Sequence, residues 1–236
     1  LFATAVRSWD LREVPLAQPA EVATFATQKR RDEHLTGRWL LGHALKAWGV
    51  GDLSVLEVVR DERRAPSLSY IHGVWKRAPL PNLSIAHSEG MAFVALIDET
   101  YTVGFDAEPI HRTLAENAYD MMAKGEELER LRERPTSVFQ AWTGKEAVQK
   151  CLGQGMHLNP RDIRIPIETT SCELSIENSK IQLDYWTELE YHLSLATQVA
   201  KVDSPTPEDR LLEVTRAAML ADPDWGVGCK TTREGA

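Results

Sequence analysis

The sequence predicts an α+β fold made of two halves of roughly 100 residues each. Three observations support this prediction. Segments with apolar residues at helical spacing are interspersed with short runs rich in β-branched residues. A Thr-Gly-basic sequence near the start of a helical run that ends at glycine occurs twice, in residues 36–49 and 143–153, and this echo fits either a coincidence or two halves of related design. The 236 residues are enough to bury a sizeable core.

In the first half, residues 19–49 are expected to form a helix that ends at Gly49-Val-Gly51. Its apolar face comprises Leu35, Trp39, Leu40, Leu45 and Trp48. Residues 82–98 predict a β-hairpin around Glu89-Gly90, and residues 101–105 predict a further strand, which Pro109 ends because proline cannot donate to a ladder.

In the second half, residues 112–134 predict a polar helix that Pro135 interrupts. Thr136 or Ser137 is expected to cap a second helix over residues 138–153. Period-2 alternation predicts four strands, over residues 162–167, 172–177, 180–186 and 191–197. We therefore expect an N-terminal half over 1–103 and a C-terminal half over 104–203. The extension over 204–236 is expected to be a linker, a short helix and a partly mobile tail.

The composition is that of an ordinary water-soluble protein, with 43% hydrophobic and 26% charged residues. The net charge of −8 argues against general nucleic-acid binding, which depends on basic residues. Basic residues nevertheless crowd the first third and leave a local anion site open: Lys29, Arg30, Arg31, Arg38, Lys46, Arg60, Arg63 and Arg64. Three cysteines without a paired motif, no membrane-length apolar run and no signal-peptide pattern predict a cytoplasmic protein.

Two acidic residues, Asp106 and Glu108, end the strand in the sequence TVGFDAEP. Alternate residues of a strand face the same side, so these carboxylates should project together about 7 Å apart. Neighbouring like charges raise each other's pKa unless a cation lies near them. The pair therefore fits either a metal site or a solvated strand end.

A further acid–base pair lies in the sequence WTGKEAVQK, where Glu146 and Lys150 are one helical turn apart. Such a pair is often only a surface ion pair. Together with Asp106 and Glu108, however, Glu146 would complete an oxygen-donor set suited to Mg²⁺. His87, in SIAHS, fits either an ordinary polar residue or part of an anion-binding corner.

Five motifs taken in order resemble those of the surfactin-type 4′-phosphopantetheinyl transferases. The motifs are KRRDEHLTGR…LG, RAP, SIAHS, VGFDAEP and WTGKEAVQKCLGQG, and they span residues 28–155. The first block and RAP resemble the subgroup that serves siderophore and mycobacterial-type synthases. The resemblance implies a pseudo-twofold pair of similar α+β halves with the active site in the cleft between them.

The activity that this resemblance implies is transfer of the 4′-phosphopantetheine arm of coenzyme A to a serine of an acyl or peptidyl carrier protein. Apo carrier becomes holo carrier, and 3′,5′-ADP is released. Coenzyme A is the co-substrate, and Mg²⁺, or alternatively Mn²⁺, is the metal. The pathways implied are fatty acid, polyketide or nonribosomal peptide biosynthesis, without a choice among them.

The resemblance also implies roles for individual residues. Asp106, Glu108 and Glu146 would be the metal ligands, with Asp106 also at the coenzyme A diphosphate. Lys150 would stabilise or protonate the departing oxygen. Arg30, Arg38 and His87 would bind the 3′-phosphate of coenzyme A, and Arg64 would lie over its phosphates. Glu126, with Glu127 beside it, is the candidate general base, although a solvated helical acid fits the same pattern and a metal-bound water could take the proton instead.

The sequence departs from the family pattern in three of these motifs. Ala86 precedes the histidine where many relatives have serine, Arg64-Ala65-Pro66 replaces Gly-Lys-Pro, and Ala107 separates the two acids. None of these changes removes an expected metal ligand, so we expect an active enzyme that works as a monomer. The alternatives are a catalytically silent coenzyme A-binding module and a metal-dependent phosphohydrolase or nuclease.

Overall fold

The computed structural model describes residues 1–74, 77–167 and 169–200, and Leu1–Ala200 forms one compact unit. Antiparallel sheets combined with helices confirm the predicted α+β class. The linker, short helix and tail predicted after Val202 lie outside the described residues. The predicted boundary between residues 103 and 104 falls within one strand, Tyr101–Pro109.

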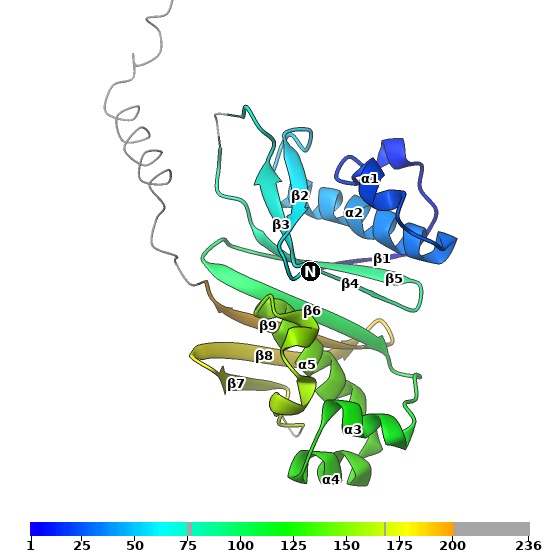
Figure 1. Cartoon of the computed structure of the whole chain (residues 1–236), viewed down its shortest axis with the longest axis vertical. Helices are drawn as coiled ribbons and strands as arrows, with labels where there is room; N and C mark the ends of the chain where they lie inside the picture. The colour runs from blue at the N-terminus through cyan, green and yellow to red at the C-terminus, as the bar shows by residue number, and fades with distance from the viewer. Residues whose placement is uncertain (75–76, 168, 201–236) are drawn as a thin grey trace, which may run out of the picture. The chain divides into compact units, whose positions relative to one another are not determined.

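The N-terminal part contains a helix on a three-stranded sheet, with a separate hairpin beside them (Figure 1). Its elements are β1 (Phe2–Ala5), α1 (Pro19–Val22), α2 (Gln28–Trp48), β2 (Leu56–Arg60), β3 (Pro66–Tyr70), β4 (Asn82–Ser88) and β5 (Met91–Ile97). The sheet order is β1-β5-β4, and β2 pairs with β3. The apolar face of α2, including Leu41 and Leu45, packs in one buried cluster with Ala92 and Val94 of β5.

The helix predicted over residues 19–49 is two helices. Thr27 is the N-cap of α2, with its side chain accepting a hydrogen bond from the Arg30 amide at 3.2 Å, so the chain breaks between α1 and α2. Gly49, at φ 105°, ends α2 as predicted. The hairpin over 82–98 is confirmed as β4 and β5, whereas β1, β2 and β3 were not predicted.

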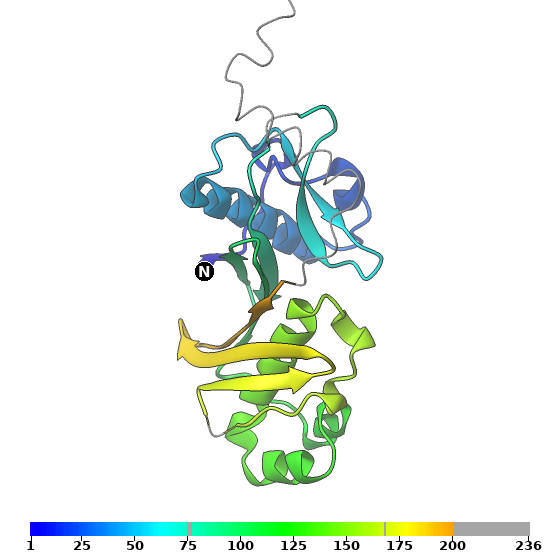
Figure 2. The same cartoon turned by 90° about the vertical axis from the view of Figure 1, so that its left-hand side faces the viewer.

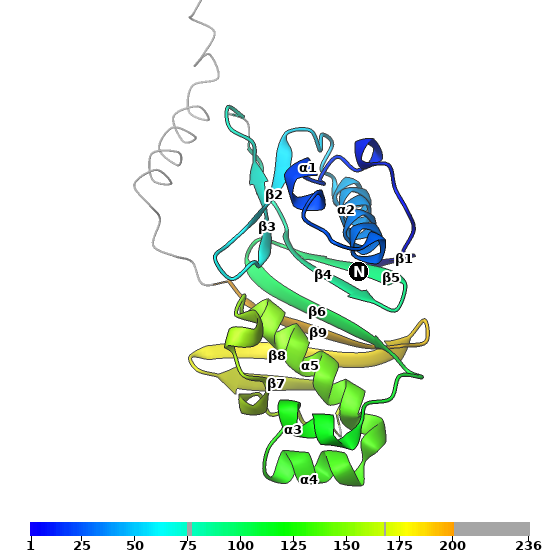
Figure 3. The same cartoon turned by 45° about the vertical axis from the view of Figure 1, so that its right-hand side comes forward.

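The C-terminal part contains a four-stranded antiparallel sheet crossed by one long helix (Figures 1 and 3). Its elements are β6 (Tyr101–Pro109), α3 (Tyr119–Met122), α4 (Glu126–Glu133), α5 (Val138–Cys151), β7 (Ser171–Ile176), β8 (Ser179–Glu188) and β9 (Tyr191–Val199). The sheet order is β6-β9-β8-β7. The strands predicted over 172–177, 180–186 and 191–197 are thus confirmed with small shifts of their ends.

Three predictions in this part are wrong. Residues 112–134 do not form one helix, because a break at Ala123–Gly125, with Gly125 at φ 57°, separates α3 from α4. Residues 162–167 form no strand, since the Ile163 carbonyl and the Ile165 amide bond to side chains instead of a neighbouring strand. Ser137 is the N-cap of α5, but its side chain makes no capping hydrogen bond.

The two parts meet where β4 and β6 lie side by side. The Phe105 amide of β6 donates to Ser84 Oγ of β4 at 2.9 Å. Around this bond, Phe93, Phe105 and Leu193 contribute to a buried apolar cluster drawn from both sheets. In Figure 2, the first sheet lies between α2 and the strands of the second sheet. This junction places β4 beside β6, which in turn packs against α5.

Gly104 allows β6 and α5 to pack with their backbones in contact. A Cβ at this position would lie 1.9 Å from the Ala147 carbonyl oxygen and 2.3 Å from the Cys151 amide nitrogen. Residues 104, 106 and 108 share one face of the strand. The close contact therefore places Asp106 and Glu108 on the side of β6 that faces α5.

Within the described residues, no helix combines the length and apolar character that crossing a bilayer requires. Among the described residues, Cys151 and Cys172 are free thiols.

Candidate functional site

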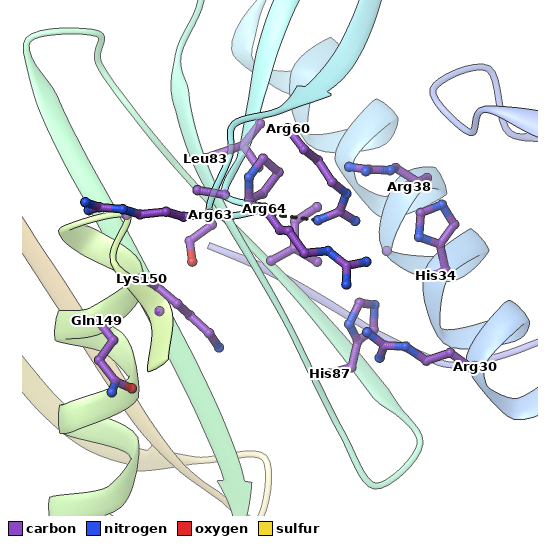
Figure 4. Close-up of a pocket in the computed structure, with 17 residues that line it drawn as sticks. Arg30, His34, Arg38, Arg60, Arg63, Arg64, Leu83, His87, Gln149 and Lys150 are labelled. Carbon is purple, nitrogen blue, oxygen red and sulfur yellow. Dashed lines mark hydrogen bonds between the residues drawn. The ribbon is translucent and has the colours of Figure 1, made fainter. Parts of the chain in front are cut away.

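A cavity of about 280 Å³ opens between α2, the β2–β3 turn, β4 and the C-terminal end of α5. Six cationic side chains line it: Arg30, Arg38, Arg60, Arg63, Arg64 and Lys150. Figure 4 shows Arg38, Arg60 and Arg64 converging from one side, with Lys150 reaching in from α5 on the other. The predicted anion-binding residues of the first half, Arg30, Arg38, Arg64 and His87, are thus brought together in one place.

Several polar atoms of this cavity are buried without a hydrogen-bond partner. They are Nε and Nη1 of Arg38, Nε2 of His34 and Nε2 of His87. Arg38 is only 2% exposed, and its remaining nitrogen, Nη2, lies 3.5 Å from Glu21 Oε2. A buried donor without a partner is costly, and a bound anion would satisfy it. The cavity is therefore built for a negatively charged ligand.

Gly37 gives His87 room beside α2. A Cβ on Gly37 would lie 2.6 Å from His87 Nε2, so any larger residue would displace the imidazole ring. Gly37 of the first motif therefore leaves space for the His87 ring.

Both histidines of the cavity are neutral near pH 7. Burial, aided by the positive charge of Arg30, lowers the pKa of His87 to about 4. Burial and the charge of Arg38 likewise lower the pKa of His34 to about 4. An anion placed among these groups would favour their protonated forms and would raise both pKa values.

The two histidines should make the ligand-free protein sensitive to acid. Unfolded histidine binds a proton below about pH 6.5, whereas the folded pKa values are near 4. Stability therefore falls as the pH drops from 6.5 towards 4, by about 2 kcal/mol for each histidine between pH 7 and pH 5. Urea unfolding at these two pH values measures the loss.

The variant His87→Gln isolates the part of this acid-induced loss of stability that comes from His87. Its free energy of unfolding should fall by about 2 kcal/mol less than that of the wild type between pH 7 and pH 5. His72→Gln, which changes an exposed histidine, should show the wild-type loss. Equal losses in the wild type and in His87→Gln would contradict the assignment.

The acidic residues lie next to this cavity, around Lys150. Lys150 Nζ donates to Asp106 Oδ1 at 2.6 Å and to the Phe105 carbonyl at 3.1 Å, and it lies 3.8 Å from Glu146 Oε2. Asp106 is 6% exposed. Burial raises its pKa to about 7 against the effect of Lys150, and the charges of Glu146 and Glu108 add to the rise. The structure thus brings Asp106, Glu146 and Lys150 together.

Glu108 lies on the same face of β6 but is already engaged. Its Oε2 accepts from Ser88 Oγ at 2.9 Å and from Arg112 Nη1 at 2.5 Å. To bind a metal ion, the Glu108 carboxylate would have to give up at least its ion pair with the partly exposed Arg112.

The chemistry of these groups fits a magnesium ion. Three carboxylates supply the oxygen donors that Mg²⁺ prefers, and the raised pKa of Asp106 marks a crowded, buried set of acids. Within the described parts of the chain, no three carboxylate, histidine or cysteine side chains already lie close enough together to hold a metal. Asp106 and Glu146 both pair with Lys150, so the lysine ammonium lies between these two acids.

The two acids at the start of α4 lie in different settings. Glu126 is exposed and does not line the cavity. Glu127 accepts from Lys145 Nζ at 2.8 Å and from the Ile165 amide at 3.0 Å. Lys145 has no exposed surface and also donates to the Pro160 and Ile163 carbonyls. Glu127 therefore anchors the segment after α5, a role that the sequence did not indicate.

Replacing Lys145 with methionine should cost about 3–5 kcal/mol of stability, because it leaves the Glu127 carboxylate buried without its cation. Urea unfolding tests this. The control Lys180→Met removes an exposed pair with Glu173 and should change stability by less than about 1 kcal/mol. A loss for Lys145→Met as small as that of the control would contradict the structural role.

Some residues of the site had no sequence signal. His34 is one of the residues that line the cavity. Glu21 binds Arg60, which lies 39 residues later in the sequence, so no local pattern links Glu21 to Arg60. Ala86, where many relatives have serine, lies in the buried cluster between the sheets and not among the cavity-lining residues. This departure therefore alters the core rather than the cavity.

Comparison with known proteins finds a similarity for part of the chain. No curated protein matches the sequence. Residues 102–201, which include β6, α5 and β9, match the model of the 4′-phosphopantetheinyl transferase superfamily. The matched region contains Asp106, Glu108, Glu146 and Lys150, so the similarity to this superfamily covers the part of the chain that holds these acids and the lysine.

Proposed function

We propose that this protein moves the 4′-phosphopantetheine arm of coenzyme A onto a serine of an acyl or peptidyl carrier protein, with Mg²⁺ and with release of 3′,5′-ADP. The cavity is the observation that carries the proposal. It gathers six cationic side chains, and one of them, Lys150, is hydrogen-bonded to a buried acid. Coenzyme A carries a diphosphate and a 3′-phosphate, which match this excess of positive charge.

In the proposed reaction, the serine oxygen bonds to the phosphorus that carries the pantetheine arm. The bond from this phosphorus to the bridging diphosphate oxygen breaks, and 3′,5′-ADP leaves with the electron pair. Burial opposes the charge of Lys150, but Asp106 and Glu146 outweigh it and raise the pKa of the ammonium. Lys150 is therefore protonated and can stabilise the departing oxygen.

Asp106, Glu108 and Glu146 would hold Mg²⁺, which when bound supplies positive charge against the diphosphate.

We propose Glu126 as the base that takes the serine proton, since a carrier protein that docks from outside would meet this exposed acid. A turnover rate unchanged in Glu126→Ala would reject this part of the proposal. We also propose that this protein belongs to the surfactin-type group of these enzymes and, within it, to the subgroup that serves siderophore and mycobacterial-type synthases. We propose further that it works as a monomer built from two similar halves.

Arg38 is expected to contribute to coenzyme A binding. Arg38→Ala should raise KM for coenzyme A roughly 10- to 100-fold with a smaller change in kcat, because it removes charge-assisted hydrogen bonds made before and during reaction. Steady-state kinetics measures this. Lys46→Ala, an exposed change elsewhere on α2, is the control and should behave like the wild type. An unaltered KM in Arg38→Ala would rule out its phosphate role.

Release of 3′,5′-ADP, followed by chromatography with and without an apo carrier protein, separates the proposal from its alternatives. A transferase releases 3′,5′-ADP only when the carrier is present. A phosphohydrolase would release it from coenzyme A alone, and a silent binding module would release none.

A further inference from the structure

Arg60 differs from the other arginines of the cavity in where its donors point. Its Nε donates to Glu21 Oε1 at 2.8 Å, and its Nη2 lies 2.7 Å from the same oxygen. Its Nη1 donates to the backbone carbonyl of Arg64 at 3.0 Å, the bond drawn in Figure 4. Each of its three nitrogens is thus bonded to the protein itself, whereas Nε and Nη1 of Arg38 have no partner.

The carbonyl that Arg60 binds belongs to a strained turn. Arg64 has φ 68°, in the left-handed region that residues with a side chain rarely adopt. Asp61 Oδ1 accepts from the Arg63 amide at 2.9 Å and from the Ala65 amide at 2.7 Å, which closes the turn. Such a backbone conformation persists only where its surroundings hold it.

We propose that the Glu21–Arg60 ion pair is a positioning device: it anchors the β2–β3 turn and thereby holds the Arg64 guanidinium over the cavity. Glu21 lies on α1 and Arg60 at the end of β2, so the pair fastens the turn to the helical layer. Arg60 is then a positioning residue rather than a phosphate ligand. The consequence for coenzyme A rests on the proposed function, but the anchoring of the turn does not.

A competing interpretation makes the opposite prediction. If Arg60 bound phosphate directly, Glu21 would be an internal anion that competes with the ligand, and its removal would strengthen binding. If the pair anchors the turn, removal of Glu21 weakens binding, because Arg64 is no longer held in place. Glu21 Oε2 also lies 3.5 Å from Arg38 Nη2 and 3.7 Å from His34 Nε2, so Glu21→Gln alters more than the turn. The sign of its effect on binding therefore decides between the two roles only together with the digestion of the turn itself.

Calorimetric titration with coenzyme A provides the first test. Glu21→Gln and Arg60→Lys should each weaken binding by about tenfold. Lysine keeps the positive charge but offers a single nitrogen, so it cannot make the three bonds of Arg60. Glu62→Gln, which removes an equal charge from an exposed position in the same turn, is the control and should not weaken binding. Tighter binding by Glu21→Gln, or wild-type affinity in Arg60→Lys, would overturn the proposal.

Limited trypsin digestion provides a second test that needs no ligand. Trypsin cleaves after Arg63 and Arg64, and a released turn should be cut several-fold faster in Glu21→Gln and Arg60→Lys than in the wild type or Glu62→Gln. Thermal unfolding confirms that each variant is folded at the digestion temperature. Unchanged cleavage in folded variants would refute the anchoring role. Wild-type protein that fails to bind coenzyme A would refute the proposed function instead, while the digestion would still test the anchor.

Discussion

Asp106→Asn should lose carrier modification by on the order of 10³-fold while remaining folded. The carboxylate pairs with Lys150 and lies at the centre of the acidic residues that would hold Mg²⁺. Asparagine keeps the shape of the side chain but removes the negative charge that both the metal and the lysine require. Initial rates at saturating Mg²⁺ measure the loss, and thermal unfolding checks the fold.

A matched control for this change is Asp120→Asn, which removes an exposed carboxylate that pairs with Arg132 on the surface. It should retain the wild-type rate. Substantial Mg²⁺-dependent transfer by Asp106→Asn would contradict the assignment of Asp106 as a metal ligand.

Gly104→Ala should cost about 3 kcal/mol of stability or more, because its methyl group would clash with the backbone of α5. The clash cannot be relieved by rotating a side chain, since its partners are the Ala147 carbonyl and the Cys151 amide. Strand β6 must therefore move away from α5, which separates Asp106 from Lys150. We expect lower stability in urea unfolding together with a large loss of transfer.

Gly144→Ala tests whether this sensitivity is specific to the backbone contact. A Cβ at Gly144 would meet only side chains, Leu183 Cδ2 at 3.3 Å and Ile165 Cδ1 at 3.5 Å. These can adjust, so the cost should be clearly smaller than for Gly104→Ala. Near wild-type stability and activity in Gly104→Ala would show that the β6–α5 contact does not position the site.

The sequence predicts those parts of the fold that depend on local signals. Alternation and the Glu89-Gly90 turn suffice for the β4–β5 hairpin, and Gly49 suffices for the end of α2. The prediction of a strand over 162–167 is wrong because Ile163 and Ile165, although buried at alternate positions, lie in a loop. There the backbone bonds to Lys145 and Glu127, which come from elsewhere in the chain.

The candidate site follows the same rule. Asp106, Glu146 and Lys150 could be selected because their motifs resemble those of a known family, and the structure brings these three residues together. Glu21 and His34 could not be selected, because their positions depend on how α1 and α2 pack against the β2–β3 hairpin. Long-range ion pairs leave no periodic trace in a sequence.

Intact-mass spectrometry of an apo carrier protein, incubated with this protein, coenzyme A and Mg²⁺, tests the central claim most directly. Apo carriers of the fatty acid, polyketide and peptide synthase types should be tried, with EDTA in a parallel reaction. We expect a mass gain equal to one phosphopantetheine arm on at least one carrier, and no gain with EDTA. Bound coenzyme A without a mass gain on any of these carriers would contradict the transferase and favour a silent binding module.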